Sequence, residues 1–282
     1  MIRFGPAGNS KGFYDAGYKA TVDAAAWLST LGLNAFEYSF GRGVNIGGDT
    51  ARKIGYEMKK YGIAISVHAP YFINFANPDP EKAENSFGYV FQALEALDNL
   101  GGTRCVVHTA TTGGRPRGEA IALAAQRLEG LAARIADGKY NGSVICLETM
   151  GKFSQIGTAE EIIAFCKISD CFYPCFDFGH INCYMQGGLK TADGYKRIID
   201  LTARELGEKR ADNMHIHFSK IQYGPSGEIR HLDLSDTKYG PDFEPLARVL
   251  QDYKLNPVVI CESAEIMAED ALRLKKIYTE IV

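Results

Sequence analysis

Histidines and carboxylates recur near the ends of short apolar runs along this chain of 282 residues. The runs read AISVHAP, CVVHTA, VICLETM, YPCFDFGH, NMHIHFS and PVVICES. With one further histidine in a polar segment, they supply His68, His108, Glu148, Asp177, His180, His215, His217, His231 and Glu262. Imidazoles and carboxylates without thiolates suit Zn²⁺, and also Mn²⁺ or iron. The residue types therefore predict a centre that holds more than one metal ion.

The joint pattern argues against a purely structural explanation. A single histidine in a strand is often a hydrogen-bonded structural group, and a single glutamate is often an ion-pair partner. Here six strands would each bury a polar or ionised group, at a cost on the order of several kcal/mol for each unpaired group. A shared metal centre explains why these strands carry such groups at the same end.

Two histidines differ from the others in position. His217 follows His215 by two residues, so both side chains face the same side of a strand. His217 is a metal ligand, a substrate contact or a packed neighbour, and we favour a substrate contact. His231 lies in the polar segment GPSGEIRHLDLSD, which we expect to form a loop.

The elements that position these residues alternate regularly, because apolar runs of strand length are followed by longer segments of helical period. The expected strands are residues 2–6, 35–40, 64–69, 105–110, 144–149, 173–178, 213–218 and 257–262. The expected helices are about 16–31, 49–61, 81–100, 117–137, 158–168, 191–206, 243–253 and 265–280. Eight such units without a linker predict one α/β domain over residues 1–282, a (β/α)8 TIM barrel. The reactive groups of such a barrel lie at the C-terminal strand ends, where these side chains are expected.

Composition and charge narrow the class of protein. With 46% hydrophobic residues the chain can bury a large core, and its net charge of −3 gives no general attraction to nucleic acid. The seven cysteines are odd in number and form no CxxC pair, which suits reduced thiols. The N-terminal MIRFGPAGNS lacks the apolar core of a signal peptide, and no apolar stretch reaches membrane-spanning length. We therefore expect a soluble, cytoplasmic and monomeric protein without a membrane partner.

Several motifs resemble one known family. The sequence contains His68-Ala69-Pro70-Tyr71 with Ile73-Asn74 after it, and Phe176-Asp177-Phe178-Gly179-His180. The shorter matches are Val107-His108, Leu147-Glu148-Thr149, Met214-His215 with Ser219-Lys220, Arg230-His231 and Cys261-Glu262. In this order, over nearly the whole chain, the segments resemble the endonuclease IV family of apurinic/apyrimidinic endonucleases, within the xylose-isomerase-like TIM barrels.

The resemblance implies three metal-binding sets, occupied by two or three zinc ions. The first ion would be held by His68, His108 and a bridging Glu148. The second would be held by Glu148, Asp177, His215 and Glu262. The third would be held by His180 and His231, with an aspartate that the family places two residues before the second of these histidines. In this chain Ile229 occupies the position of that aspartate, and Glu228 stands next to it.

The resemblance also implies a reaction. A zinc-dependent hydrolase of this kind cleaves DNA on the 5′ side of an abasic site in base-excision repair, and Glu148 and Glu262 are its expected catalytic groups here. Two metals about 3.5–4 Å apart can polarise a phosphodiester and lower the pKa of water. Tyr71 matches the family position that wedges into DNA, and His217 is an expected substrate contact. The basic residues expected to meet phosphates are Arg42, Lys220 and Arg230, with Arg115, Arg117 and Lys152 on the same rim.

Three segments depart from the family pattern. Gly5-Pro6-Ala7-Gly8 replaces the usual segment after the first strand. Ser39-Phe40-Gly41-Arg42-Gly43 replaces the DNA-contacting loop after the second strand, and His108-Thr109-Ala110 replaces the usual Pro-Gly-x-His. The metal chemistry therefore carries over better than the DNA recognition.

A single-metal sugar isomerase or epimerase of the same superfamily is the alternative. Glu148, Asp177, His215 and Glu262 match the metal set of the ketose epimerases, in which the two glutamates would exchange protons next to a carbonyl. Such an enzyme does not need four further imidazoles at metal-binding positions, so these imidazoles favour the hydrolase. A barrel that has lost catalysis and only binds a ligand is a third alternative.

Overall fold

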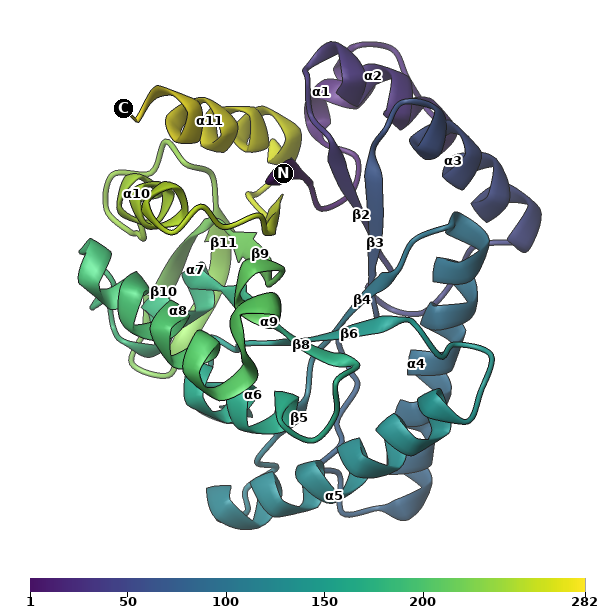
Figure 1. The fold of residues 1–282 in the computed structure, drawn as a ribbon, viewed down its shortest axis with the longest axis vertical. Coiled ribbons are helices and arrows are strands. Elements are labelled where there is room, and N and C mark those ends of the chain that lie inside the picture. The colour runs from purple at the N-terminus through teal and green to yellow at the C-terminus, as the bar shows by residue number, and fades with distance from the viewer. Residues whose placement is uncertain (282) are drawn as a thin grey trace.

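Eight parallel strands form the centre of the fold. The computed structural model describes residues 1–281, and its strands lie inside a ring of helices (Figure 1). The strands are β1 (Arg3–Pro6), β2 (Ala35–Ser39), β3 (Ala64–His68), β4 (Arg104–Val107), β6 (Val144–Glu148), β8 (Phe172–Asp177), β9 (His215–Phe218) and β12 (Val258–Cys261). All eight expected strands are present, and the largest difference is at β4, which ends at Val107 rather than at residue 110.

The barrel closes where β1 meets β2. The strand order is β1-β12-β9-β8-β6-β4-β3-β2, and the two outer strands come together through a parallel bridge between Ala7 and Glu37. Beside it, the Gly8 amide donates a hydrogen bond of 2.9 Å to the Glu37 carbonyl. Gly5 permits this close approach, since a Cβ there would lie 1.8 Å from the Ala35 carbonyl oxygen. The expected single-domain (β/α)8 TIM barrel is confirmed.

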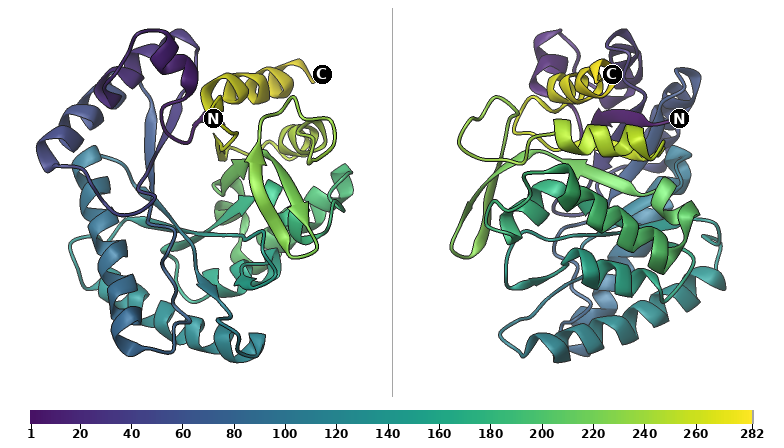
Figure 2. Two further views of the ribbon diagram at one scale, coloured as in Figure 1. Left: turned by 180° about the vertical axis from the view of Figure 1, so that it is seen from behind. Right: turned by 60° about the vertical axis from the view of Figure 1, so that its left-hand side comes forward.

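Helices cover the outside of the barrel (Figures 1 and 2). They are α1 (Lys11–Asp15), α2 (Ala24–Thr30), α3 (Gly48–Lys60), α4 (Pro80–Leu100), α5 (Arg117–Ala136), α6 (Ala159–Cys166), α7 (Phe178–Tyr184), α8 (Ala192–Leu206), α9 (Glu208–Asp212), α10 (Glu244–Asp252) and α11 (Met267–Glu280). The long helix α4 starts after Asp79, whose side chain accepts a hydrogen bond from the Glu81 amide, and it ends at Gly101 with a φ of 69°. Across residues 1–281, every helix is too short or too polar to span a lipid bilayer.

The expectation of one helix over residues 16–31 is wrong. α1 ends at Asp15, and Gly17 adopts a φ of 89°, which a helix cannot accommodate. The chain then forms a 3₁₀ turn (Thr21–Asp23) before α2 begins at Ala24. The apolar spacing that suggested one helix therefore belongs to two short elements joined by a glycine turn.

Two additional strand pairs lie beyond the C-terminal ends of the barrel strands. β10 (Lys220–Gly224) and β11 (Gly227–Leu232) form an antiparallel hairpin that stands off one end of the barrel (Figure 2). β5 (Ala110–Thr111) pairs with β7 (Gln155–Ile156). The expectation of a loop around His231 is wrong, because His231 lies on β11.

The interior of the barrel is partly polar. Val106, Cys146, Tyr173 and Cys175 pack together inside the barrel. Residues two apart on a strand face the same way, so the inward positions above Cys146 and Cys175 are Glu148 and Asp177. The polar side chains inside the barrel are buried and include Glu37, Ser66, His68, Glu148, Asp177, His215 and His217. This polar interior leads directly to the open end of the barrel.

Candidate metal centre

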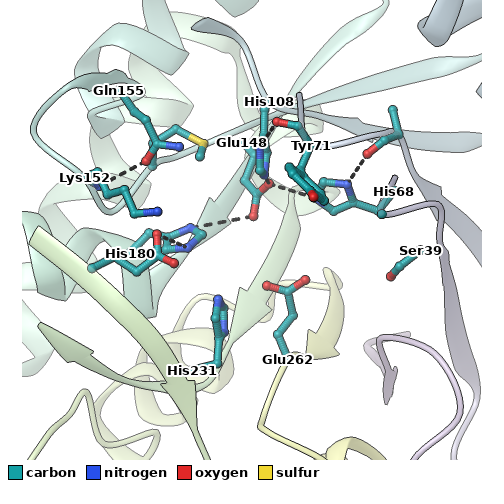
Figure 3. A pocket seen from close by; sticks show the side chains of 14 residues that line it. Ser39, His68, Tyr71, His108, Glu148, Lys152, Gln155, His180, His231 and Glu262 are labelled. Atoms are coloured by element: carbon teal, nitrogen blue, oxygen red, sulfur yellow. Dashed lines mark hydrogen bonds and ion pairs between the residues drawn. The ribbon is translucent and has the colours of Figure 1, made fainter. Parts of the chain in front are cut away.

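A cavity of about 380 Å³ opens at the C-terminal end of the barrel. Most of the expected ligands line it, namely His68, His108, Glu148, His180, His231 and Glu262 (Figure 3). The other three expected site residues of this kind, Asp177, His215 and His217, are fully buried. The structure therefore gathers side chains from six strands or their following segments around one space.

The first group of potential ligands is His68, His108 and Glu148. Their donor atoms lie within 4.8 Å of one another. Glu148 Oε2 is 3.0 Å from His68 Nε2 and 2.9 Å from His108 Nε2. The other ring nitrogens face backbone carbonyls, with His68 Nδ1 2.7 Å from the Ala69 oxygen and His108 Nδ1 3.3 Å from the Tyr71 oxygen. Metal-binding histidines are commonly oriented by such a contact on the far nitrogen, so this group fits a metal ion.

Charge interactions shift the pKa values of Glu148 and His68 in this group in opposite directions. Burial alone would raise the pKa of Glu148, but the His217 and His108 rings hold it well below the usual range. Burial alone would lower the pKa of His68, but its hydrogen bond and charge interaction with Glu148 raise it to about 9. Glu148 is therefore an ionised carboxylate between imidazoles, which is the form that a metal requires.

The second group is Glu148, Asp177, His217 and Glu262, whose donor atoms also lie within 4.8 Å of one another. His217 Nδ1 is 2.9 Å from Glu148 Oε1 and 3.5 Å from Glu262 Oε1. Asp177 Oδ2 is buried and makes no hydrogen bond to any of the described residues. His180 Nδ1 approaches this oxygen to 3.2 Å as an ion-pair partner, and a metal ion shared by the four side chains of the second group would also bind the carboxylate.

His217, and not His215, stands beside these three carboxylates, which corrects the expectation from the resemblance. Both rings face the barrel interior, as the two-residue spacing implies. In the parallel ladder of β8 and β9, however, His217 pairs with Asp177, whereas His215 pairs with Cys175. His215 therefore lies deeper, with Nε2 3.0 Å from Glu37 Oε2. Burial lowers the pKa of His215 to about 4, so this ring is neutral.

The third group is Asp177, His180 and His231. His180 was expected at a strand end, but it lies in the first turn of α7, where its amide donates a 2.8 Å hydrogen bond to Asp177 Oδ1. Its Nδ1 is 3.2 Å from Asp177 Oδ2. His231 Nδ1 is 2.8 Å from Ser219 Oγ, which leaves Nε2 free to face the cavity.

A β-bulge brings Glu228 to this third group. Opposite β10, Arg230 pairs with Gln222 and Glu228 pairs with Tyr223, so Ile229 is an extra residue in β11. Ile229 is 56% exposed. Because the bulge takes up one residue, Glu228 returns to the face of the hairpin that carries His231.

The carboxylate of Glu228 then reaches the cavity. Its Oε2 lies 3.4 Å from His180 Nε2, and its amide donates a 3.0 Å hydrogen bond to the Gly151 carbonyl. The pKa of His180 would be lowered by burial, but Asp177 and Glu228 raise it to about 9. The chain therefore has Ile229 where the resemblance implies an aspartate, but the carboxylate of Glu228 lies beside His180 in its place.

The expected substrate contacts are only partly brought together. Tyr71 lines the mouth of the cavity and is 51% exposed, and Lys152 also lines it (Figure 3). Arg42, Lys220 and Arg230 are not among the lining residues. Lys220 Nζ bonds instead to the Asp236 carbonyl at 2.7 Å and to Asp242 at 2.9 Å, and Arg230 Nε bonds to Gln222 at 2.9 Å.

The side chains of two other arginines expected at the rim of the cavity contact other groups of the protein. Arg117 forms a bidentate pair with Glu161, with separations of 2.6 and 2.7 Å, and Arg115 donates to the Ala76 carbonyl. Their guanidinium groups stabilise loops beside the cavity rather than project into it.

Glu37 is a residue of the site that the sequence reasoning missed. It is fully buried on β2 and contacts both His215 and His217. The signal was present, since an ionisable residue interrupts the apolar run AFEYS, and a buried carboxylate requires partners.

Comparison with known proteins agrees with this architecture. A model of the xylose isomerase-like TIM barrel family matches residues 25–277. An uncharacterized protein of Methanocaldococcus jannaschii is 32% identical over 286 residues, which cover 100% of this chain and 98% of that protein. A probable endonuclease 4 of Acholeplasma laidlawii is 31% identical over 186 residues, which cover 62% of this chain and 60% of that protein. The chain thus matches 60% of the length of that endonuclease.

Solved structures with this fold include proteins of two kinds. Endonuclease IV from Thermus thermophilus aligns with a TM-score of 0.68 and 22% identity, over 93% of this chain and 95% of that chain. A D-tagatose 3-epimerase-like protein aligns with a TM-score of 0.64 and 21% identity, over 89% of this chain and 90% of that chain. The expected resemblance to endonuclease IV is confirmed by these matches. The chain belongs to the xylose isomerase-like TIM barrel family.

Proposed function

We propose that the protein is a metal-dependent phosphodiesterase that hydrolyses DNA on the 5′ side of abasic sites. The observation that carries this proposal is the sharing of Glu148 and Asp177 among three adjacent groups of potential ligands. Shared carboxylates hold neighbouring ions close together, which is the arrangement that phosphoryl chemistry uses.

The residues divide into three sets around the cavity. One ion is assigned to His68, His108 and Glu148. A second is assigned to Glu148, Asp177, His217 and Glu262, and a third to Asp177, His180 and His231 together with Glu228. The ligand types suit zinc, with Mn²⁺ or iron as alternatives. When bound, neighbouring ions would polarise the phosphodiester and lower the pKa of water.

The chain itself supplies positioning and proton handling. Glu262 projects into the cavity (Figure 3), where the carboxylate oxygen that does not bind the ion can accept a proton from water near the substrate. Lys152 lines the same space and provides a positive charge for a phosphate. Tyr71, with the exposed Phe72 beside it, presents aromatic surface on which an unstacked base can lie.

A single-metal epimerase is the second candidate, because Glu148, Asp177, His217 and Glu262 by themselves form a complete set for one ion. Solved sugar epimerases share the fold. The hydrolase is favoured because four further imidazoles, those of His68, His108, His180 and His231, line the cavity. One ion would leave these rings without a ligand role.

The test is a paired assay of the zinc-loaded protein. We expect nicking of duplex DNA that contains an abasic analogue, loss of nicking after chelation, and no conversion of ketoses such as D-tagatose. His68→Ala should abolish nicking, and Tyr71→Ala should weaken it without a change in zinc content. Tyr56→Ala, which alters an exposed tyrosine on the outer helix α3, serves as the matched control. Turnover of a ketose with no nicking of DNA would establish the epimerase instead.

A further inference from the structure

Glu37 forms a support beneath the candidate metal centre. Its Oε2 accepts a 2.7 Å hydrogen bond from Ser66 Oγ and lies 3.0 Å from His215 Nε2. Its Oε1 lies 2.9 Å from His217 Nε2. Within residues 1–281, neither Glu37 Oε1 nor His217 Nε2 meets the geometry of a hydrogen bond with any residue, so the 2.9 Å approach is an ion-pair contact and each atom is the nearest charged partner of the other.

The ring of His217 is oriented in the opposite sense to the rings of His68 and His108. Those two rings direct Nε2 to Glu148 and Nδ1 to a backbone carbonyl. His217 directs Nδ1 to Glu148 and Nε2 to Glu37. An imidazole that binds a metal through one nitrogen carries its proton on the other. The nitrogen of His217 that would carry this proton therefore lies beside a carboxylate rather than a backbone carbonyl, and a carboxylate is the stronger acceptor once the two groups are aligned.

We propose that Glu37 is a positioning residue that fixes the ring and tautomer of His217 and makes it a stronger metal ligand. His215 and Ser66 hold the opposite oxygen of Glu37 and so set the direction of its carboxylate. The inference rests on the metal centre of the proposed function, but not on DNA as the substrate.

The alternative is that Glu37 serves only the packing of the barrel. Ser66 and His215 already satisfy Oε2, and neither of them belongs to a group of potential ligands that contains Glu148. Oε1 is instead directed at the one histidine that contacts Glu148 and Glu262. A residue that orients a metal ligand needs an oxygen directed at that ligand, as Oε1 is. A residue that serves only packing does not need one.

The test measures zinc binding to the full chain. Glu37→Gln keeps the shape of the side chain and removes its charge. Competition with a chromophoric chelator should show one zinc ion bound roughly 10–100-fold more weakly, with the other ions unchanged. The weakened step should be the one that disappears in His217→Ala. The zinc count at saturation should stay that of the unmodified protein, and Glu37→Asp should recover part of the affinity.

Glu161→Gln is the matched control. Glu161 lies on α6, away from the centre, and the substitution removes the charged partner of Arg117. It should leave every zinc step unchanged, even if the metal-free protein unfolds at a lower temperature. If Glu37→Gln does not fold, Ser66→Ala removes one support of Oε2 and should weaken the same zinc step by a smaller factor.

Three outcomes would overturn the inference. They are unchanged zinc affinity in folded Glu37→Gln, a lower zinc count at saturation, which would make Glu37 itself a ligand, and an absence of zinc binding by the unmodified protein. A failure to nick abasic DNA, with the zinc steps behaving as expected, would refute the proposed function alone.

Discussion

Asp177 on β8 and His217 on β9 stand side by side in the parallel ladder, and this register decides which histidine lies beside the carboxylates of the second group. The neighbouring pair one step deeper is Cys175 with His215. Two histidines on the same face of one strand are thus given different partners, a cluster of carboxylates for one and the buried Glu37 for the other.

Alanine substitutions should separate these two histidines. His217→Ala should lower the zinc content by about one ion per chain, because it removes an imidazole from the second group. His215→Ala should keep the zinc content but lower the free energy of unfolding by about 1–3 kcal/mol, since Glu37 loses a buried hydrogen-bond partner. Elemental analysis and urea unfolding of the metal-free proteins provide the two measurements. The reverse pattern would show that His215 is the ligand.

Glu228 should be a ligand of the third ion in spite of its position in the sequence. Glu228→Gln should lower the zinc content by about one ion, because the charge beside His180 is lost. Ile229→Ala should have no effect, since the extra residue of the bulge remains. Deletion of Ile229 should also leave the zinc content unchanged, because Glu228 would then stand two residues before His231 on the same face. Loss of an ion in the deletion variant would contradict this account of the bulge.

Zinc binding should release protons. Burial would lower the pKa values of His68 and His180, but Glu148 beside the first, and Asp177 and Glu228 beside the second, raise both to about 9. Near pH 7.5 both rings of the metal-free protein are therefore protonated, and a metal must displace those protons. Burial would also lower the pKa of His217, but neighbouring acidic groups raise it well above its usual value, and His217 belongs to the second group. We therefore expect release of about three protons per chain near pH 7.5, fewer above pH 9, and weaker zinc binding as the pH falls.

A zinc titration in weak buffer with a pH indicator measures this release. His180→Ala should release about one proton fewer than the unmodified protein at the same pH. Equal release by the two proteins would show that His180 is neutral before the metal binds.

The junction at which β1 meets β2 should tolerate no side chain at position 5. Gly5→Ala should lower the free energy of unfolding by more than about 2 kcal/mol, because its Cβ would meet the Ala35 carbonyl oxygen at 1.8 Å. Gly88→Ala on the exposed face of α4 is the matched control. A Cβ there would meet nothing within 4 Å, and the substitution should be stabilising by up to about 1 kcal/mol. Chemical unfolding of both variants checks the difference, and similar stabilities would contradict the close approach of β1 and β2.

Much of the fold could be predicted because the apolar runs and amphipathic segments alternate without interruption. The same alternation placed Glu148 at the end of its strand, and His68 likewise. The choice between His215 and His217 could not be predicted, since it depends on the register between strands that are far apart in the sequence. Glu228 required knowledge of a bulge, which arises only when β10 and β11 pair.

The rim cations show a further limit of sequence reasoning. A lysine or arginine near a predicted site looks available until its partner is known. Lys220 is bound by Asp242, which follows it by twenty-two positions, and Arg117 is bound by Glu161 on another helix. Such pairs form only when the chain has folded, so the sequence overestimates the charge that a substrate meets.

The seam between β1 and β2 links the integrity of the barrel to the retention of its ions. The backbone of Glu37 bridges Ala7 and accepts the hydrogen bond of the Gly8 amide, while its carboxylate faces His217. A local opening of these strands would withdraw the carboxylate from beneath the ring, and a ligand that binds only the closed form opposes such opening. The Gly8 amide should therefore exchange its hydrogen with deuterated water more slowly when zinc is bound. Zinc binding would then stabilise the junction at which the first and second strands close the barrel.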